Sequence, residues 1–226
     1  MVLSTLEENQ LQSALIYQYE IDATDDSTAS RIIRLVGREK RVLELGCATG
    51  SMSAVLSRQN ACDVTGVEID PDAAALARPH LARLVVGDLD RMEWRSVVEH
   101  DQFEVIIAAD VLEHLREPGR CLKNIAEHLS TSSGFLVISL PNIAHLAVIS
   151  GLLCGEFPYA ETGLLDKTHL RFFTPRGAAR LIAQCGLTIE HAEFVSAGPP
   201  PHISAVVCES LSPVSDRYNS ASNSTA

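Results

Sequence analysis

Five short apolar runs follow one another from residue 41 onward, and segments with helical periodicity separate them. Short continuous apolar runs are typical of strands that are buried on both faces of a parallel sheet. The amphipathic segments between the runs supply the helices that connect such strands. The pattern therefore predicts an α/β domain, a doubly wound sheet with helices on both faces. The five runs span residues 42–45, 64–69, 83–86, 103–109 and 134–140.

Two further apolar runs, at 187–195 and 203–208, predict a different kind of connection. The Gly-Pro-Pro-Pro turn between them is too short for a helical crossover, whereas it suits an antiparallel hairpin. With this hairpin the predicted sheet is mixed and has seven strands.

The two ends of the chain differ from the middle. The first 40 residues show two helical patterns, and the first of them begins with an S-x-x-E capping box at Ser4. We therefore expect residues 1–40 to form a helical cap over one mouth of the domain. Ser, Asn, Ala and Thr dominate residues 212–226, a composition that predicts a mobile tail. The main domain is then expected over residues 41–211.

Composition and charge narrow the class of protein. Of the 226 residues, 46% are hydrophobic and 21% are charged, which is typical of a globular chain. The 18 Lys and Arg residues against 29 Asp and Glu residues give a net charge of −11, so a surface that binds nucleic acid is not expected. Six scattered cysteines without a C-x-x-C pair, and an N-terminus without a signal pattern, favour a reducing cytoplasm.

The longest apolar stretch, residues 143–154, has 12 residues, whereas a helix that spans a bilayer needs about 20. No membrane span is therefore expected. A buried lid helix is the favoured interpretation of this stretch, and contact with a membrane surface or with the partner in a homodimer is the alternative.

The most informative segment is VLELGCATG, residues 42–50, in which a predicted strand runs into Gly46, Ala48 and Gly50. Glycine lets a backbone approach a ligand closely, so a ligand is expected on this turn. The spacing is not the G-x-G-x-x-G of a dinucleotide site. Glu44 would repel a pyrophosphate and would favour an ammonium or sulfonium group. The expected ligand is therefore cationic or zwitterionic.

The string E-x-G-x-A-x-G after a strand resembles the first motif of Rossmann-like S-adenosylmethionine (SAM)-dependent methyltransferases. The resemblance implies SAM as cofactor and the strand order 3-2-1-4-5-7-6, with the seventh strand antiparallel. It also implies that Glu68, 22 residues after Gly46, accepts hydrogen bonds from the ribose hydroxyls. Asp88 matches the family acid that accepts a bond from the adenine amino group. The cofactor-binding residues are then expected to be Glu44, Gly46, Cys47, Ala48, Gly50, Glu68, Ile69, Asp88, Leu89, Ala109 and Asp110.

Two residues of this region have an ordinary structural interpretation. Asp70 precedes Pro71 and is expected to cap a helix rather than to contact the ligand. Cys47 is expected to be a small loop residue without chemistry of its own.

After the fifth predicted strand, residues 142–173 form an insertion in which many polar residues are interspersed among apolar ones. An insertion at the carboxyl ends of the strands is where an acceptor pocket and its lid are expected. The strings PNIAH and GLLDKTHLRFFT resemble a bacterial branch of these methyltransferases that is associated with glycosyltransferases and with sugar or secondary-metabolite modification.

Transfer of a methyl group to a hydroxyl needs a base, and the insertion offers candidates for it. His169 is the first candidate, with Asp166 as the carboxylate that orients its ring, and His145 is the second. Each histidine also has a structural interpretation, in which it only holds the insertion in place. Glu113 and His114 could meet Asp166 and His169 over the pocket and hold a metal ion, but a structural or pocket-lining role is favoured, so no metal is expected.

The leading functional expectation is a SAM-dependent methyltransferase for a small-molecule acceptor, most plausibly the O-methylation of a sugar or a related hydroxylated metabolite. One alternative is an O-methyltransferase of a phenolic or quinone precursor. A non-catalytic SAM-binding or partner-binding module is the other, and it would keep the glycine loop and Glu68 without a usable base.

Overall fold

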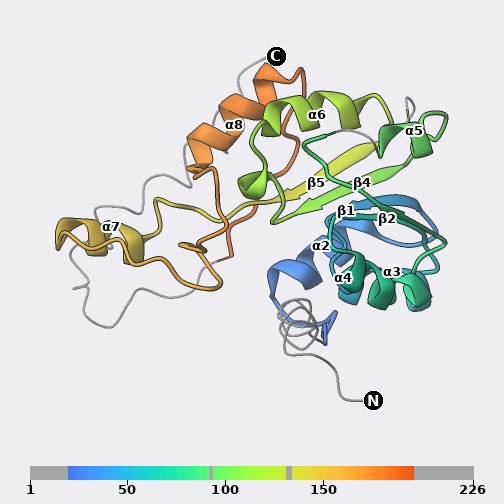
Figure 1. Ribbon diagram of the computed structural model, residues 1–226, viewed down its shortest axis with the longest axis horizontal. Coiled ribbons are helices and arrows are strands. Elements are labelled where there is room, and N and C mark those ends of the chain that lie inside the picture. The colour runs from blue at the N-terminus through green and yellow to red at the C-terminus, as the bar shows by residue number, and fades with distance from the viewer. Residues whose placement is uncertain (1–19, 92–93, 131–133, 196–226) are drawn as a thin grey trace, which may run out of the picture.

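The computed structural model describes residues 20–91, 94–130 and 134–195, and Figure 1 shows how their helices and strands are arranged. Five parallel strands form one sheet in the order β3-β2-β1-β4-β5. The strands are β1 (Arg41–Leu45), β2 (Asp63–Glu68), β3 (Arg83–Val86), β4 (Val105–Ala109) and β5 (Phe135–Ser139). Each predicted run from 42 to 140 thus contains a strand, and the doubly wound α/β class is confirmed.

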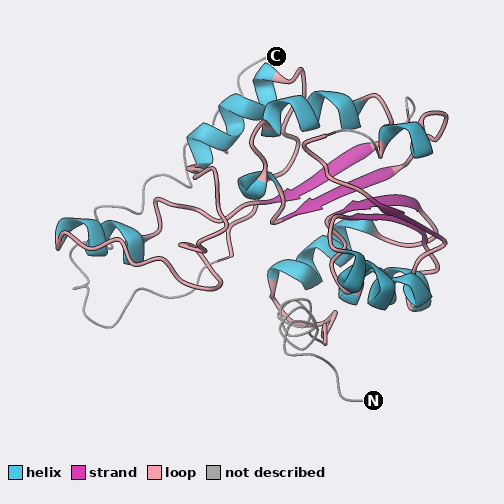
Figure 2. Ribbon diagram, viewed as in Figure 1, coloured by secondary structure: helices cyan, strands magenta, loops and turns pink. Residues whose placement is uncertain are grey.

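Helices cover both faces of the sheet (Figures 1 and 2). One layer consists of α2 (Thr28–Val36), α3 (Ser51–Arg58) and α4 (Pro71–Ala77). The other layer consists of α5 (Arg95–Val98), α6 (Pro118–Ala126) and α8 (Pro175–Gln184). Two single turns of 3-10 helix, η1 (Arg78–His80) and η2 (Leu112–His114), follow α4 and β4.

The side chains of β1 alternate between the two faces, which divides the core in two. Leu43 and Leu45 belong to a cluster with Trp94 and Leu122 under α5 and α6. Val42 belongs to the opposite cluster under α2 and α3. The same alternation places the Glu44 side chain on the α3 side. Glu44 is the buried charged residue of β1, because Arg41, the other charged residue of this strand, is exposed.

The sheet has five strands among the described residues, so the predicted count of seven is wrong for this part of the chain. Residues 187–195, the predicted sixth strand, are described and form no strand. In the expected order this segment pairs only with the seventh strand, since the seventh lies between it and β5. The predicted seventh strand, residues 203–208, lies outside the described residues, as do the first predicted helix and the tail at 212–226.

The predicted insertion at 142–173 extends from the carboxyl edge of the sheet and carries α7 (Leu146–Leu153) away from the body of the domain (Figure 1). The expectation of a buried lid helix is wrong here, because Val148 is the buried residue of α7, and Leu153 is 84% exposed. A helix that projects from the body has too few neighbours to cover its apolar side chains. No helix in the described ranges is long and apolar enough to cross a membrane.

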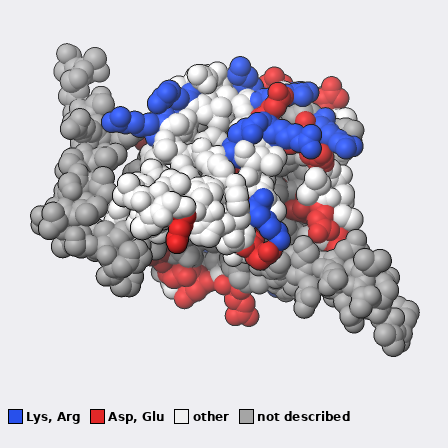
Figure 3. Space-filling model, turned by 60° about the vertical axis from the view of Figure 1, so that its left-hand side comes forward, with Lys and Arg blue, Asp and Glu red and all other residues white. Residues whose placement is uncertain are grey.

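Charge is distributed unevenly over the surface. On the face that Figure 3 shows, Lys and Arg side chains gather along the upper part, and a broad uncharged area lies beside them. Several exposed side chains of the insertion are apolar, namely Leu152, Leu153, Tyr159, Leu170 and Phe172. The insertion therefore exposes a group of large apolar side chains.

Candidate cofactor and acceptor site

The loop after β1 turns sharply at the carboxyl edge of the sheet. Gly46, Ala48 and Gly50 all have positive φ values, of 63°, 46° and 80°. The N–H groups of Gly46 and Cys47 both donate to the carbonyl oxygen of Val67, at 2.8 and 3.1 Å, which ties the loop to β2. Ala48 adopts the left-handed region at a cost of about 1–2 kcal/mol, so the loop keeps its tight shape although its middle position is not glycine.

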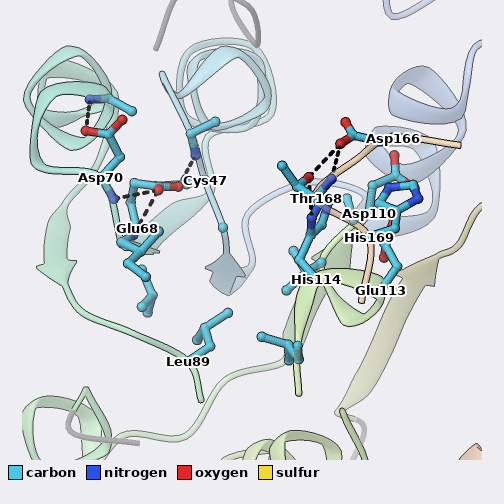
Figure 4. Close-up of a pocket in the computed structure, with 18 of the residues that line it drawn as sticks. Cys47, Glu68, Asp70, Leu89, Asp110, Glu113, His114, Asp166, Thr168 and His169 are labelled. Carbon is cyan, nitrogen blue, oxygen red and sulfur yellow. Dashed lines mark hydrogen bonds between the residues drawn. The ribbon is translucent and has the colours of Figure 1, made fainter. Parts of the chain in front are cut away.

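Glu68 ends β2 and holds this loop in place. Its carboxylate accepts hydrogen bonds from the backbone N–H groups of Ala48 at 2.8 Å, Ile69 at 2.8 Å and Asp70 at 2.9 Å (Figure 4). A carboxylate has about four acceptor positions, so at least one remains after these three bonds. Glu68 is therefore already oriented by the protein while it still faces the cavity.

Glu44 lies on the buried side of the same loop. Ser53 of α3 donates a hydrogen bond from its Oγ to Oε2 of Glu44 at 2.5 Å. Burial is the main cause that raises the pKa of Glu44 to about 7; the Ser53 bond opposes this shift, and the charge of Glu68 adds to it. This carboxyl is therefore poised to become ionised when a cation approaches.

Two residues of the loop, Cys47 and Gly50, have packing roles. Burial raises the pKa of the Cys47 thiol, which keeps it neutral, so the sequence-based interpretation of Cys47 as a residue without chemistry fits its place. A Cβ added to Gly50 would lie 2.8 Å from Cα of Ala77, so Gly50 is needed for the close approach of α3 and α4.

Asp70 caps α4 through a bond from the Asp72 N–H at 2.8 Å, which confirms the prediction that it caps a helix.

The ends of β3 and β4 complete this half of the site. Asp88 accepts a bond from the Asp90 N–H at 2.9 Å and lies 3.3 Å from Nε of Arg91. Asp90 in turn accepts bonds from the backbone of Arg116 and Glu117, so it joins the loop after β3 to the start of α6. Sequence reasoning missed Asp90, because the backbone groups that it binds lie 26 and 27 residues away and no local pattern indicates them.

A second group of polar side chains lies across the cavity from Glu68 (Figure 4). Glu113 and His114 belong to η2, and His169 comes from the insertion. One potential metal-ligand atom from each of these three residues lies within 4.8 Å of the others. The rings of His114 and His169 meet edge to face, with centroids 4.8 Å apart. We call Glu113, His114 and His169 the acceptor-side triad.

Glu113 is fully buried, and neither carboxylate oxygen receives a hydrogen bond from another described residue. Burial raises its pKa to about 8, and the charges of Asp110 and Asp166 contribute to the same shift. The backbone carbonyl of Glu113 accepts bonds from Leu170 and Arg171, at 2.8 and 2.9 Å. These two bonds dock the insertion onto η2 and bring His169 to Glu113.

Asp166 orients a histidine, but not the one expected from the sequence. Its Oδ1 accepts bonds from the N–H and the hydroxyl of Thr168, both at 2.7 Å, and Thr168 Oγ1 lies 3.1 Å from Nδ1 of His114. The threonine hydroxyl has one hydrogen, which Asp166 receives, so Nδ1 of His114 must carry the proton of the second bond. The predicted pairing of Asp166 with the ring of His169 is therefore replaced by a pairing with His114 through Thr168.

His145 lies apart from this group. It precedes α7, where its Nδ1 accepts a bond from the Ala147 N–H at 3.2 Å, and it does not line the cavity. Arg171 is also committed to the protein, because its guanidinium donates to the carbonyl oxygens of Leu170 and Arg116. Both side chains shape the insertion rather than the cavity.

One cavity of about 1020 Å³ joins the two halves of the site. Its lining includes every predicted cofactor residue except Gly50, and from the insertion it includes residues 162–164, Asp166 and 168–170. Helix α2 also contributes to the lining of the cavity. The α2 residues that line it are Thr28, Ala29 and Ile32.

The same fold occurs in solved methyltransferase structures. The magnesium protoporphyrin IX methyltransferase of Synechocystis PCC 6803, solved with bound SAH, superposes with a TM-score of 0.58 at 14% identity, over 85% of this chain and 90% of that one. A SAM-dependent methyltransferase from Archaeoglobus fulgidus gives a TM-score of 0.55 at 18% identity, over 84% and 83%. The fold is thus that of the Rossmann-like SAM-dependent methyltransferases.

The family follows from the sequence match. The model of a methyltransferase domain family matches residues 21–192, so the chain belongs to this family. The chain is therefore a SAM-dependent methyltransferase domain, and its cofactor is SAM.

Curated relatives are similar over about two thirds of their own length. The ubiquinone biosynthesis O-methyltransferase of Aeromonas salmonicida is 27% identical over 165 residues, which cover 71% of this chain and 68% of that protein. The protein of the same name from Neisseria meningitidis serogroup C is 26% identical, over 67% and 65%.

The buried Glu44 predicts a pH-dependent stability. Because its pKa is raised from the usual 4.5 to about 7, the folded chain binds a proton there that the unfolded chain releases. The contribution of this proton to the free energy of unfolding is complete below about pH 4.5. It is lost as the pH rises through about 7, a loss on the order of 3 kcal/mol. In Glu44→Gln, the midpoint of thermal unfolding without SAM should therefore rise relative to the unsubstituted chain between pH 5 and pH 8. Glu99→Gln, at an exposed position, is the control, and a constant difference across this range would contradict the assignment.

Proposed function

We propose that this chain transfers the methyl group of SAM to a phenolic hydroxyl of a small aromatic acceptor of the quinone-precursor type. The observation that carries the proposal is the cavity of about 1020 Å³ in which Glu68 and the acceptor-side triad face each other. The names of the curated relatives, O-methyltransferases of ubiquinone biosynthesis, support this acceptor class. The expected cytoplasmic location stays a prediction.

The residues of the cofactor half suit SAM in their chemistry, and the volume of the cavity is large enough for it. Glu68 would offer a preoriented carboxylate to the ribose hydroxyls, and Asp88, which lines the same cavity, would accept a bond from the adenine amino group. Glu44 offers a negative charge to the cationic methionine part. The cavity of about 1020 Å³ lies at the upper end of the range for small-molecule sites, about 300–1,000 Å³, so it has room for an acceptor beside the cofactor.

The triad supplies what the acceptor needs. When bound, SAM presents a methyl group on a sulfonium; the acceptor oxygen forms a bond to this carbon as the carbon–sulfur bond breaks, and the electron pair stays on sulfur. The hydroxyl proton must pass to a base. Burial and the neighbouring His169 lower the pKa of His114, so its ring is neutral at pH 7, and Thr168 holds the tautomer whose Nε2 has a free lone pair. His114 is therefore suited to accept the proton, and His169, which lines the same cavity, is the second candidate.

The apolar part of the lining favours an aromatic acceptor. Pro141, Leu164 and Leu170 face the same cavity as the triad. A flat ring buries more surface against such side chains than a sugar does, because a sugar carries hydroxyls that need partners. The sugar acceptor expected from the strings in the insertion stays a prediction, which the acceptor experiment below also tests.

The acceptor experiment uses the purified chain, SAM with a labelled methyl group, and a panel of catechols, monophenols and sugars. Label should enter an aromatic hydroxyl, which mass spectrometry locates in the product. Transfer to a sugar hydroxyl instead would overturn the aromatic acceptor in favour of the sugar. Tight SAM binding with transfer to no member of the panel would favour the non-catalytic SAM-binding module.

Glu68→Gln tests the cofactor half. The amide keeps the shape of the carboxylate but loses its charge and one acceptor oxygen, so the dissociation constant of SAM should rise about tenfold or more. Isothermal titration calorimetry measures the change, circular dichroism checks the fold, and Glu99→Gln is the matched control at an exposed position. A folded Glu68→Gln chain that binds SAM as tightly as the control would remove Glu68 from the cofactor site.

His169→Ala tests the acceptor half. We expect SAM affinity to stay within about twofold, because His169 lies across the cavity from Glu68, whereas kcat should fall roughly 10²- to 10⁴-fold, the usual range for loss of proton-transfer help. His100→Ala, at an exposed position, is the control. If kcat fell only in proportion to the fraction of folded protein, His169 would be a structural residue of the insertion.

A further inference from the structure

We propose that Ser53 of α3 is a positioning residue for SAM binding, because its hydroxyl holds the Glu44 carboxyl ready for the cationic part of the cofactor. Ser53 is fully buried and contacts Glu44, which in turn lines the cavity. The inference rests on the cofactor half of the proposed function, in which Glu44 receives the cationic part of SAM. It does not depend on the identity of the acceptor.

Ser53 is a buried hydroxyl on a helix face that is otherwise apolar. It is the third residue of α3, and the other buried side chains of this helix are those of Met52, Val55 and Leu56. Inside a helix serine is less favourable than alanine, because its hydroxyl competes for backbone groups. Here the hydroxyl points to the sheet instead and donates to Oε2 of Glu44 at 2.5 Å. A specific partner thus accounts for a polar residue at this place.

The surroundings of Glu44 explain why this hydroxyl matters. Glu44 pairs with Gly66 of β2 and Ile107 of β4, and the buried side chains of α2 and α3 on this face are uncharged. The titratable groups that act on Glu44 or respond to it are Glu68, whose charge raises the pKa of Glu44, and the neutral thiol of Cys47. Among the described residues no cation forms an ion pair with Glu44. Ser53 therefore favours a negative charge where the neighbouring acid opposes it.

The Ser53 hydroxyl and a cationic ligand act on Glu44 in the same direction. Burial raises the pKa of Glu44 to about 7, so about half of these carboxyls are protonated at pH 7 in the free chain. A donated O–H bond favours the ionised form. SAM needs this form, because a protonated carboxyl offers no charge to the ammonium and sulfonium groups. Without Ser53, SAM must displace a proton that Glu44 holds more tightly.

Ser53→Ala tests this role through the pH dependence of SAM binding to the full chain. Calorimetry gives the dissociation constant of SAM between pH 6 and pH 8.5. The constant of the variant should exceed that of the unsubstituted chain about tenfold at pH 6 and no more than about twofold at pH 8.5, where Glu44 is ionised in both chains. The ratio of the two constants is compared because the amino group of SAM titrates in the same range and affects both chains equally.

Proton release gives a second measurement. Binding of SAM at pH 7 is repeated in buffers of different ionisation enthalpy, which counts the protons released to the buffer. The unsubstituted chain should release about half a proton more than Glu44→Gln does, because about half of its Glu44 carboxyls are protonated before SAM binds. Ser53→Ala should release more than the unsubstituted chain although it binds SAM more weakly.

Ser57→Ala is the matched control. Ser57 lies one turn further along α3, and its hydroxyl donates to the carbonyl oxygen of Ala54 at 3.5 Å. This variant should bind SAM as the unsubstituted chain does at every pH. Thermal unfolding verifies the fold of each variant. Ser53→Cys keeps the size of the side chain but donates more weakly, so it should show the same dependence on pH and replaces Ser53→Ala should that variant unfold.

The outcomes separate the role of Ser53 from the proposed cofactor site. A folded Ser53→Ala chain with an equal loss of SAM affinity at every pH would make Ser53 a packing residue and overturn the inference. Affinity equal to that of Ser57→Ala throughout would overturn it too. In both cases, weaker SAM binding by Glu44→Gln at pH 8 would leave the cofactor site standing. Unchanged binding by Glu44→Gln would remove Glu44 from that site and the role of Ser53 with it.

Discussion

All five described strands are parallel, so their carboxyl ends meet at one edge of the sheet, and the site depends on this constraint. Residues that are far apart in the chain are brought into one cavity because each lies at or after the end of a strand, as Gly46, Glu68, Asp88 and Glu113 do. The insertion after β5 starts from the same edge, and it therefore adds its polar side chains to this cavity.

The edge of a parallel sheet also leaves backbone groups without partners, and side chains at the ends of the strands supply them. Glu68 binds the loops after β1 and β2, and Asp90 binds the backbone before α6. Ser139 exchanges bonds with Asp110, where φ is 51°, and so joins the ends of β4 and β5. The acids that were expected to contact the cofactor thus also build the rim of the cavity. The rim is rigid because the chain satisfies it before a ligand arrives.

Local patterns predicted local structure well, and long-range pairings less well. The cap by Asp70 depends on residues two and three positions away, so the sequence is enough to predict it. The partner of Asp166 was harder, because Thr168 and His114 are 54 residues apart and no local pattern indicates that they meet. The predicted strand at 187–195 failed for a related reason, since a strand needs a partner and the expected partner lies outside the described residues.

Glu68 and Glu113, on opposite sides of the cavity, differ in how the fold compensates their buried carboxylates. The Glu68 carboxylate has backbone donors and changes little when a ligand arrives. Glu113 has no donor among the described residues, and its burial raises its pKa to about 8, so its state depends on what enters the cavity. A proton or a cation near Glu113 relieves a cost that the fold alone leaves in place. A buried acid with a raised pKa thus lies at each end of the cavity, Glu44 where the cationic part of the cofactor is expected and Glu113 where an oxygen must lose its proton.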